Sequence, residues 1–258
     1  MEQRLVQFNG EQLACKLSGK GTPVVCIHAP CIGSLNFSYQ NALSDQFQLI
    51  VPDLPGHGES SSFGGHLSIG DLADLLDNLI QSLGIQRPFL LGYSQGASIA
   101  LEYCLRNPDS VQGAILVSAF SEVKDLYLHC RFFMAQTMSA LRGIPLLARS
   151  IASSHLDDQT MRTAWVQHAS QTDAICLGSL YSAGHQYNCT DRLNELRMPF
   201  LLVYGKEDRQ LRPYAELLDT HISHAKMIQV PNVHHQVITR AASTFNQLCR
   251  DFIQQTTK

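Results

Sequence analysis

Apolar and polar positions along the 258-residue chain follow two alternating patterns. Short continuous apolar runs, typical of strands buried on both faces, alternate with longer segments in which apolar residues recur at helical spacing. The runs that predict strands are Val24–Ile27, Phe47–Val51, Pro88–Leu91, Val111–Ala119, Pro199–Tyr204 and Lys226–Val230. Strands that alternate with helices in this way predict an α/β fold with a mostly parallel, doubly wound sheet.

Further segments predict a hairpin and two well-marked helices. Residues 3–17 alternate loosely around Asn9-Gly10, which is a hairpin signal. Residues 67–83 carry leucines at helical spacing, and Ser68 with Asp71 forms an S-x-x-D start signal. Apolar residues from Phe245 to Ile253 predict a C-terminal helix.

The pattern changes between residues 121 and 194, where strand-like runs are absent and helical spacing dominates. The chain therefore divides into a core, formed by residues 1-120 and 195-258, and a helical insertion at residues 121-194. We expect this insertion to cover one edge of the sheet as a lid.

Composition and charge indicate which kinds of partner and which cellular compartment to expect. The net charge of −3 and the pI near 6.4 give no reason to expect nucleic acid or an anionic membrane as a partner. The eight cysteines are scattered without a C-x-x-C pair, which favours reduced thiols. The N-terminus lacks the apolar stretch of a signal peptide, and no run approaches the ~20 apolar residues of a membrane span. We therefore expect a cytoplasmic protein whose partner is a small-molecule substrate, with a homodimer left open.

The strongest chemical signal is the pentapeptide Gly92-Tyr93-Ser94-Gln95-Gly96, a G-x-S-x-G motif between a predicted strand and a predicted helix. A sharp strand-to-helix turn strains the serine backbone and pushes its hydroxyl outward. The flanking glycines lack a Cβ, so strand and helix can approach each other closely. The pattern predicts Ser94 as a nucleophile and the Gln95 N–H as a donor to a developing oxyanion.

Two further candidates follow later strands of the predicted sheet. Asp208 comes just after the run that ends at Tyr204, and His235 comes just after the run that ends at Val230. Ligands of parallel sheets bind at the carboxyl ends of the strands. Ser94, Asp208 and His235 are therefore expected at one edge of the sheet.

Taken together, these motifs resemble the α/β-hydrolase family, in its lidded, esterase-like branch. The matching pieces run through most of the chain except residues 121-194, and their order of Ser, Asp and His is that of the family. Besides the elbow and His28-Ala29-Pro30, they are Asp53-x-x-Gly56-His57-Gly58-x-Ser60, Gly205-x-x-Asp208 and Pro231-Asn232-x-x-His235. The resemblance implies an α/β-hydrolase fold with Ser94 as nucleophile, His235 as base and Asp208 as the acid that orients the base. It implies no cofactor, and no metal site is expected, because His221 and His224 have no evident third ligand.

The base and the acid each have an alternative candidate nearby in the sequence. His234 adjoins His235, but the family usually has a small residue at the position of His234. Glu207 sits one residue before Asp208, and Asp53 is expected to cap its own loop instead. His28 and His57 are expected to form hydrogen bonds with loop backbone.

The segment His28-Ala29-Pro30 departs from the family pattern. The family usually has His-Gly-x here, and the N–H of x is the second oxyanion donor, but proline has no N–H. We expect the loop to shift, with the freedom that Gly33 gives it, so that the Cys31 N–H donates instead.

The insertion is expected to supply the substrate pocket. Four residues are predicted to line an apolar cavity above the serine: Phe133, Met134, Met138 and Trp165. The basic residues of the insertion form no cluster that calls for a carboxylate or a phosphate: Arg131, Arg142, Arg149 and Arg162. The expected substrate is a small, mostly apolar carboxylic ester or related acyl compound, cleaved through an acyl-enzyme on Ser94.

Two other functions could use the same residues. A C–C bond hydrolase or lyase employs the same triad, but such relatives usually carry an arginine near the elbow, where this chain has Ala97 and Ser98. A hydrolase-like small-molecule receptor or signalling protein with little turnover is the second alternative, and Pro30 keeps it open.

Overall fold

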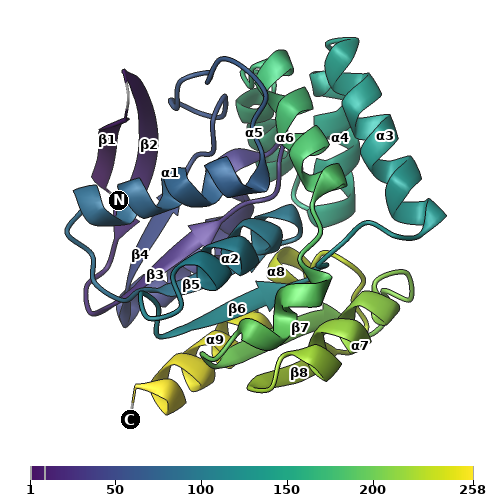
Figure 1. The fold of residues 1–258 in the computed structure, drawn as a ribbon. Coiled ribbons are helices and arrows are strands. Elements are labelled where there is room, and N and C mark those ends of the chain that lie inside the picture. Colours follow the sequence, from purple (N-terminus) through teal and green to yellow (C-terminus); the bar gives the residue numbers. More distant parts are fainter. Residues whose placement is uncertain (1, 9, 258) are drawn as a thin grey trace.

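An eight-stranded sheet forms the centre of the computed structural model, which describes residues 2–8 and 10–257 (Figure 1). Its order is β1-β2-β4-β3-β5-β6-β7-β8; β2 pairs antiparallel with β1 and β4, and the other pairs are parallel. The strands are β1 (Glu2–Phe8), β2 (Glu11–Ser18), β3 (Thr22–Ile27), β4 (Phe47–Pro52), β5 (Phe89–Tyr93), β6 (Gly113–Val117), β7 (Phe200–Gly205) and β8 (Ala225–Val230).

Helices cover both faces of this sheet (Figure 1). They are α1 (Ile69–Ser82), α2 (Gln95–Arg106), α3 (Leu126–Ala140), α4 (Ile144–His155), α5 (Gln159–Ala169), α6 (Ala174–Gln186), α7 (Arg212–His221), α8 (Val237–Arg240) and α9 (Ala242–Thr256), with 3₁₀ segments η1 (Gly33–Asp45) and η2 (Thr190–Glu195). Alternate residues of β5 point to opposite faces: Leu90 packs with α1 and α2, whereas Phe89 and Leu91 pack with η1, α8 and α9. The predicted doubly wound α/β fold is confirmed.

Side-chain caps fix where several helices begin. Ser68 and Asp71 form a capping box at the start of α1, as the sequence signal predicts. Three aspartates, at the N-caps of α3, α5 and α6, each accept a backbone N–H from their own first turn: Asp125, Asp158 and Asp173. Local sequence therefore marks where these helices begin.

Helices α3 to α6 lie between β6 and β7 in the chain and gather in the upper right of Figure 1. Helix α3 packs against α6, and α4 packs against α5. The segment is helical where helical spacing dominates the sequence. Its separation from the core as a domain, and its action as a lid, stay predictions.

The sequence also makes predictions about the hairpin, the cysteines and the helix lengths. The expected hairpin is present as the antiparallel pair β1 and β2, while Asn9 of its turn lies outside the described residues. All eight cysteines are free thiols, and each is buried except Cys130. Within residues 2–8 and 10–257, no helix has the length and apolar character needed to cross a bilayer.

Candidate active site

Ser94 stands on the turn between β5 and α2 with a strained backbone. Its φ of 53° and ψ of −121° lie outside the regions that non-glycine residues prefer. The backbone N–H of Ser94 donates to Val117 O at 2.8 Å, which ties this turn to the neighbouring strand β6. The fold therefore holds the Ser94 side chain outside regular structure, as the motif predicts.

The glycines on either side of the turn allow a very close approach of backbone segments. A Cβ on Gly96 would lie 2.1 Å from Ile27 O and 2.8 Å from His28 O, both in the chain that leaves β3. A Cβ on Gly92 would lie 2.5 Å from the Cα of Ala97. No side chain larger than hydrogen fits at either place without movement of the backbone.

Replacing Gly96 by alanine is expected to lower the free energy of unfolding by about 1–3 kcal/mol, because the added methyl group meets backbone rather than a flexible side chain. Urea denaturation measures the change. Gly178→Ala in α6 is the matched control, since its Cβ would lie 3.7 Å from its nearest neighbour, Ser139 Cβ. That variant is expected to be as stable as the native chain or more stable, and equal losses in both would contradict the packing argument.

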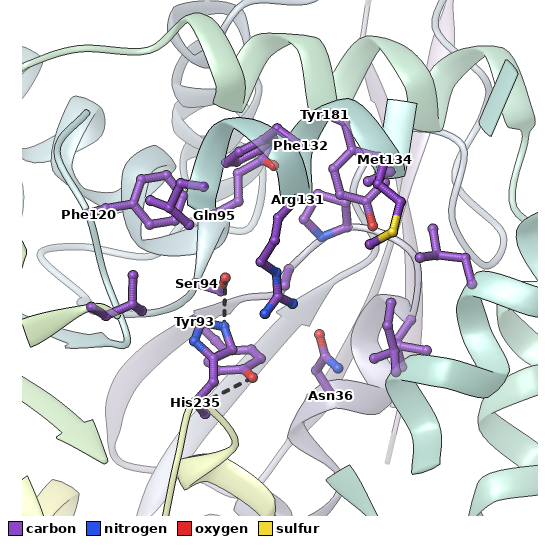
Figure 2. A pocket seen from close by; sticks show the side chains of 18 of the residues that line it. Asn36, Tyr93, Ser94, Gln95, Phe120, Arg131, Phe132, Met134, Tyr181 and His235 are labelled. Atoms are coloured by element: carbon purple, nitrogen blue, oxygen red, sulfur yellow. Dashed lines mark hydrogen bonds between the residues drawn. The ribbon is translucent and has the colours of Figure 1, made fainter. Parts of the chain in front are cut away.

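Two loops at the ends of β7 and β8 bring an acid and an imidazole to Ser94. His235 Nε2 lies 3.1 Å from Ser94 Oγ, and His235 Nδ1 lies 3.3 Å from Asp208 Oδ2. Figure 2 shows the His235 ring directed at the Ser94 hydroxyl. The side chains of His235 and Asp208 are only 19% and 9% exposed, so both are largely screened from water. The structure thus brings together the three residues that the sequence singles out.

Backbone contacts hold these two loops together. Ser118 Oγ donates to His235 O at 3.0 Å, and the Glu207 N–H donates to Val233 O at 3.0 Å. A Cβ on Gly205 would lie 2.0 Å from His234 O, so glycine is needed where the two loops cross. The orientation of the imidazole is therefore set by several strands at once.

Within the part of the chain that the structure describes, the alternative candidates for the base and the acid form no hydrogen bond with the side chain of Ser94 or His235. His234 is exposed, and the Glu207 side chain has no hydrogen bond or ion pair among the described residues. Asp53 accepts from the Ser34 N–H at 2.7 Å and from Ser34 Oγ at 3.1 Å. Its carboxylate therefore fixes the start of η1, which corrects the expectation that it caps its own loop.

The loop after β3 differs from the expected arrangement. The Cys31 N–H donates to His57 Nε2 at 2.9 Å, and Cys31 has a φ of 88°. An N–H that is already bonded to an imidazole is not free to hold an oxyanion, which corrects the expectation that Cys31 replaces the missing donor of Pro30. The Gln95 N–H has no partner within α2, since it is one of the first N–H groups of that helix.

His28 and His57 form hydrogen bonds with the backbone of this loop and of the loop after β4, as predicted. The Leu54 N–H donates to His28 Nε2 at 2.9 Å, and each imidazole places its Nδ1 near a carbonyl oxygen, Ala29 O and Pro55 O respectively. Burial lowers the pKa of His28 to about 3 and lowers the pKa of His57 as well. Both rings are therefore neutral near pH 7 and accept a backbone N–H.

Acidification below pH 7 is expected to destabilise the fold. The folded pKa values of His28 and His57 lie below the ordinary value near 6.5, so the unfolded chain takes up more protons as the pH falls through that value. Each imidazole then contributes a loss of up to about 1.4 kcal/mol per pH unit. Urea midpoints between pH 7.5 and 5.0 measure the slope. His57→Gln, which can still accept from Cys31, should give a shallower slope, and a flat native profile would contradict the argument.

A cavity of about 140 Å³ opens beside Ser94 and His235 (Figure 2). The inserted helices supply most of its apolar wall, including Leu128, Phe132, Met134, Ala135, Leu147 and Ile151. Of the predicted lining residues, Met134 is on this wall. Phe133 is instead 68% exposed, Met138 packs near Gly143, and Trp165 is buried against His155, which corrects the expectation for these three.

A buried pair in the cavity wall has no signal in the sequence. Tyr93 Oη lies 2.8 Å from His155 Nε2, and His155 Nδ1 lies 2.9 Å from Ile151 O. Because Nδ1 faces a carbonyl oxygen, Nε2 accepts from the tyrosine hydroxyl. Burial lowers the pKa of His155 to about 3. This neutral pair fastens α4 to the strand that carries Ser94, and no local signal links residues 62 positions apart.

No group of three or more histidine, cysteine, aspartate or glutamate side chains suited to a metal ion is found within the part of the chain that the structure describes. The side chains at the cavity offer a hydroxyl beside an imidazole, with a carboxylate at the other ring nitrogen.

Comparison with known proteins adds an independent finding. Residues 22–239 match the family model described as alpha/beta hydrolase fold. The chain is 26% identical over 226 residues to the pimeloyl-(acyl-carrier protein) methyl ester esterase of Yersinia enterocolitica, covering 83% of this chain and 85% of that one. It is 24% identical over 268 residues to the human serine hydrolase BPHL, covering 96% and 85%.

A similar fold is found among solved structures. The enol-lactonase from Burkholderia xenovorans superposes with a TM-score of 0.87 at 18% identity, over 97% of this chain and 100% of that one. At this level of identity the likeness concerns the fold alone.

Proposed function

The chain belongs to the alpha/beta hydrolase fold family, and we propose that it is a serine hydrolase that cleaves a small carboxylic ester or related acyl compound through an acyl-enzyme on Ser94. The observation that carries this proposal is the contact chain from Ser94 Oγ to His235 at 3.1 Å and from His235 to Asp208 at 3.3 Å. A serine hydroxyl is a weak nucleophile unless an adjacent base takes its proton.

The proposed reaction proceeds in two halves. His235 Nε2 accepts the proton of Ser94 as the oxygen attacks the substrate carbonyl, and Asp208 holds Nδ1–H and offsets the charge of the imidazolium. His235 then returns the proton to the departing alcohol. In the second half, His235 takes a proton from water, which attacks the acyl-enzyme and frees Ser94.

The oxyanion of both steps would be held by the Gln95 N–H at the start of α2. The loop after β3 offers little help, since Pro30 has no N–H and the Cys31 N–H is bonded to His57. Loss of one oxyanion donor costs about 10²–10³ in rate in enzymes of this kind. We therefore propose a hydrolase of modest turnover.

The inserted helices are proposed to act as a lid that sets substrate size. They form most of the apolar part of the cavity wall, and the Gln95 side chain donates to Leu180 O of α6, so the lid and the turn at Ser94 are in direct contact. A cavity of about 140 Å³ suits a small acyl group.

The loop after β3 favours a second candidate, a hydrolase-like receptor that binds its ligand with little turnover. The same cavity and the same three residues would be retained, and only the rate would be low. The missing donor at Pro30 and the occupied N–H of Cys31 are the observations in its favour.

Fluorophosphonate labelling followed by a substrate panel tests the proposal. Labelling of the native protein but not of Ser94→Ala, together with turnover of short p-nitrophenyl esters or thioesters, would support it. Labelling without turnover would favour the receptor. Activity on β-diketones but not on esters would favour a C–C bond hydrolase, and absence of labelling would remove Ser94 as the nucleophile.

A further inference from the structure

We propose that Arg131 and Asn36 form a subsite for a carboxylate on the substrate, so that the preferred acyl compound carries one negative charge. This inference rests on the proposed function and specifies its substrate class. It refines the expectation of a mostly apolar substrate, which follows from the sequence because the arginines of the insertion form no cluster along it. Arginines that are spread along the sequence can still include one that lines the cavity.

Arg131 is a basic residue in the cavity wall. It belongs to α3, and Figure 2 shows its guanidinium reaching down into the cavity towards Ser94 and Asn36. Its positive charge favours the ionised forms of Tyr93 and Tyr181, two other lining residues, although burial keeps the pKa of both above the ordinary value. The Arg131 charge therefore acts on these two residues of the cavity wall.

The guanidinium has no acidic partner among residues 2–8 and 10–257. Its polar contact is with Tyr127 Oη at 2.8 Å, and it also lies over the Tyr127 ring at 5.5 Å. By contrast, Arg162 of α5 donates to Leu156 O at 2.7 Å and lies 3.9 Å from Asp157 Oδ1. Arg131 thus keeps most of its five N–H donors free for a ligand.

Asn36 provides an independent sign of a polar ligand. Its side chain lines the same cavity from η1, its residue is 1% exposed, and its Oδ1 is buried without a hydrogen-bond partner. A buried amide without partners is unfavourable, and such a group in a binding cavity gains a partner when the ligand arrives. The unpartnered atom is an acceptor, and a carboxylate only accepts, so the Asn36 amide bonds a carboxylate when the side chain turns over and directs its NH₂ at the ligand, a change that leaves its shape nearly the same.

The chemistry of this pair suits a carboxylate. A planar guanidinium matches the two oxygens of a carboxylate, and one arginine balances one negative charge. No lysine lines the cavity among the described residues, and Asp208 is engaged by His235. The remaining wall is mainly apolar, so the substrate is a short acyl compound with a single carboxylate, on either its acyl part or its alcohol part.

Two matched pairs of esters test the charge directly. For the acyl part, p-nitrophenyl hydrogen adipate is compared with p-nitrophenyl hexanoate, which has a methyl group in place of the carboxylate. For the alcohol part, 4-carboxyphenyl butyrate is compared with 4-carbamoylphenyl butyrate. The native protein is expected to prefer the charged member of one pair by about 10-fold in kcat/KM, because the hydrogen bond is charge-assisted while Arg131 itself is an exposed residue.

Arg131→Gln is expected to remove that preference and to change the rate on the neutral member by less than about threefold. Arg149→Gln, an exposed arginine of α4 outside the cavity wall, is the matched control and should leave both rates unchanged. Absence of any preference in the native protein would overturn the subsite. An equal loss on both members would also overturn it, because Arg131 would then act on the reacting carbonyl rather than on a carboxylate.

A binding measurement separates failure of the subsite from failure of the proposed function. Calorimetry with monomethyl adipate and methyl hexanoate uses the Ser94→Ala protein and needs no turnover. Tighter binding of monomethyl adipate, lost in Ser94→Ala/Arg131→Gln, would support the subsite even if no ester is hydrolysed. Turnover of neutral esters without any such preference in binding would contradict the subsite and leave the proposed function standing.

Discussion

Replacing Ser94 by alanine is expected to lower kcat/KM for a short p-nitrophenyl ester by about 10⁴- to 10⁶-fold. The residue that would form the acyl-enzyme is then gone, while the cavity and the Gln95 N–H remain. Residual catalysis would come only from binding and from the oxyanion donor. Initial rates with purified protein measure the loss, and fluorophosphonate labelling should disappear in parallel.

Ser98→Ala is the matched control for this loss. Ser98 lies one turn further along α2, is fully buried, and places its hydroxyl 3.4 Å from Phe120 O. Both changes remove one serine hydroxyl, but that of Ser98 takes no part in the proposed reaction. The rate should stay within about threefold of the native value, because a single long hydrogen bond between neutral groups contributes little. A Ser94→Ala protein that keeps a tenth of the native rate would show that another group is the nucleophile.

Local sequence was sufficient to predict the parts of the site that follow directly from strand ends. A parallel sheet puts the carboxyl ends of its strands at one edge, so residues placed just after strands must lie near one another. Ser94, Asp208 and His235 meet for this reason. The glycine pattern predicted the strained turn because only glycine tolerates the contact of Gly96 with Ile27 O, where a Cβ would lie at 2.1 Å.

Packing of the inserted helices could not be predicted in the same way. Helical spacing marks which face of a helix is buried but not which residues cover that face. The sequence therefore predicts Trp165 in the cavity, whereas in the structure Trp165 lies against His155. Arg131 and Asn36 are far apart in the chain and meet the cavity from opposite elements, α3 and η1. No pattern within either segment signals that arrangement.

The loop after β3 has a missing N–H donor at one residue and an occupied N–H at the next. Proline at position 30 removes one N–H, and the next residue, Cys31, adopts a positive φ that turns its own N–H to His57. Gly33 does adopt a positive φ of 74°, but the Cys31 N–H bonds the buried imidazole rather than pointing to an oxyanion. Sequence showed that a donor was missing and could not show where its neighbour would point.

Asp208→Asn is expected to lower kcat by about 10⁴-fold, the second large effect in this site. The amide has nearly the same shape as the carboxylate but no charge to offset the imidazolium that forms on His235. Its NH₂ also favours the wrong tautomer, in which Nδ1 accepts and Nε2 carries the proton that should come from Ser94. Steady-state rates measure the loss, and an unchanged urea midpoint would show that the fold is intact.

Glu207→Gln makes the same chemical change one residue earlier and tests whether position, rather than acidity, decides the role. The Glu207 backbone N–H bonds Val233 O, but its carboxylate has no partner among the described residues, whereas the Asp208 carboxylate lies 3.3 Å from the imidazole. The Glu207→Gln protein should therefore keep the native rate within about threefold, as a half-exposed carboxylate without a partner contributes little. Loss of activity in Glu207→Gln with a mild effect in Asp208→Asn would reassign the acid, because charge at position 207 could reach His235 only if the loop after β7 rearranged.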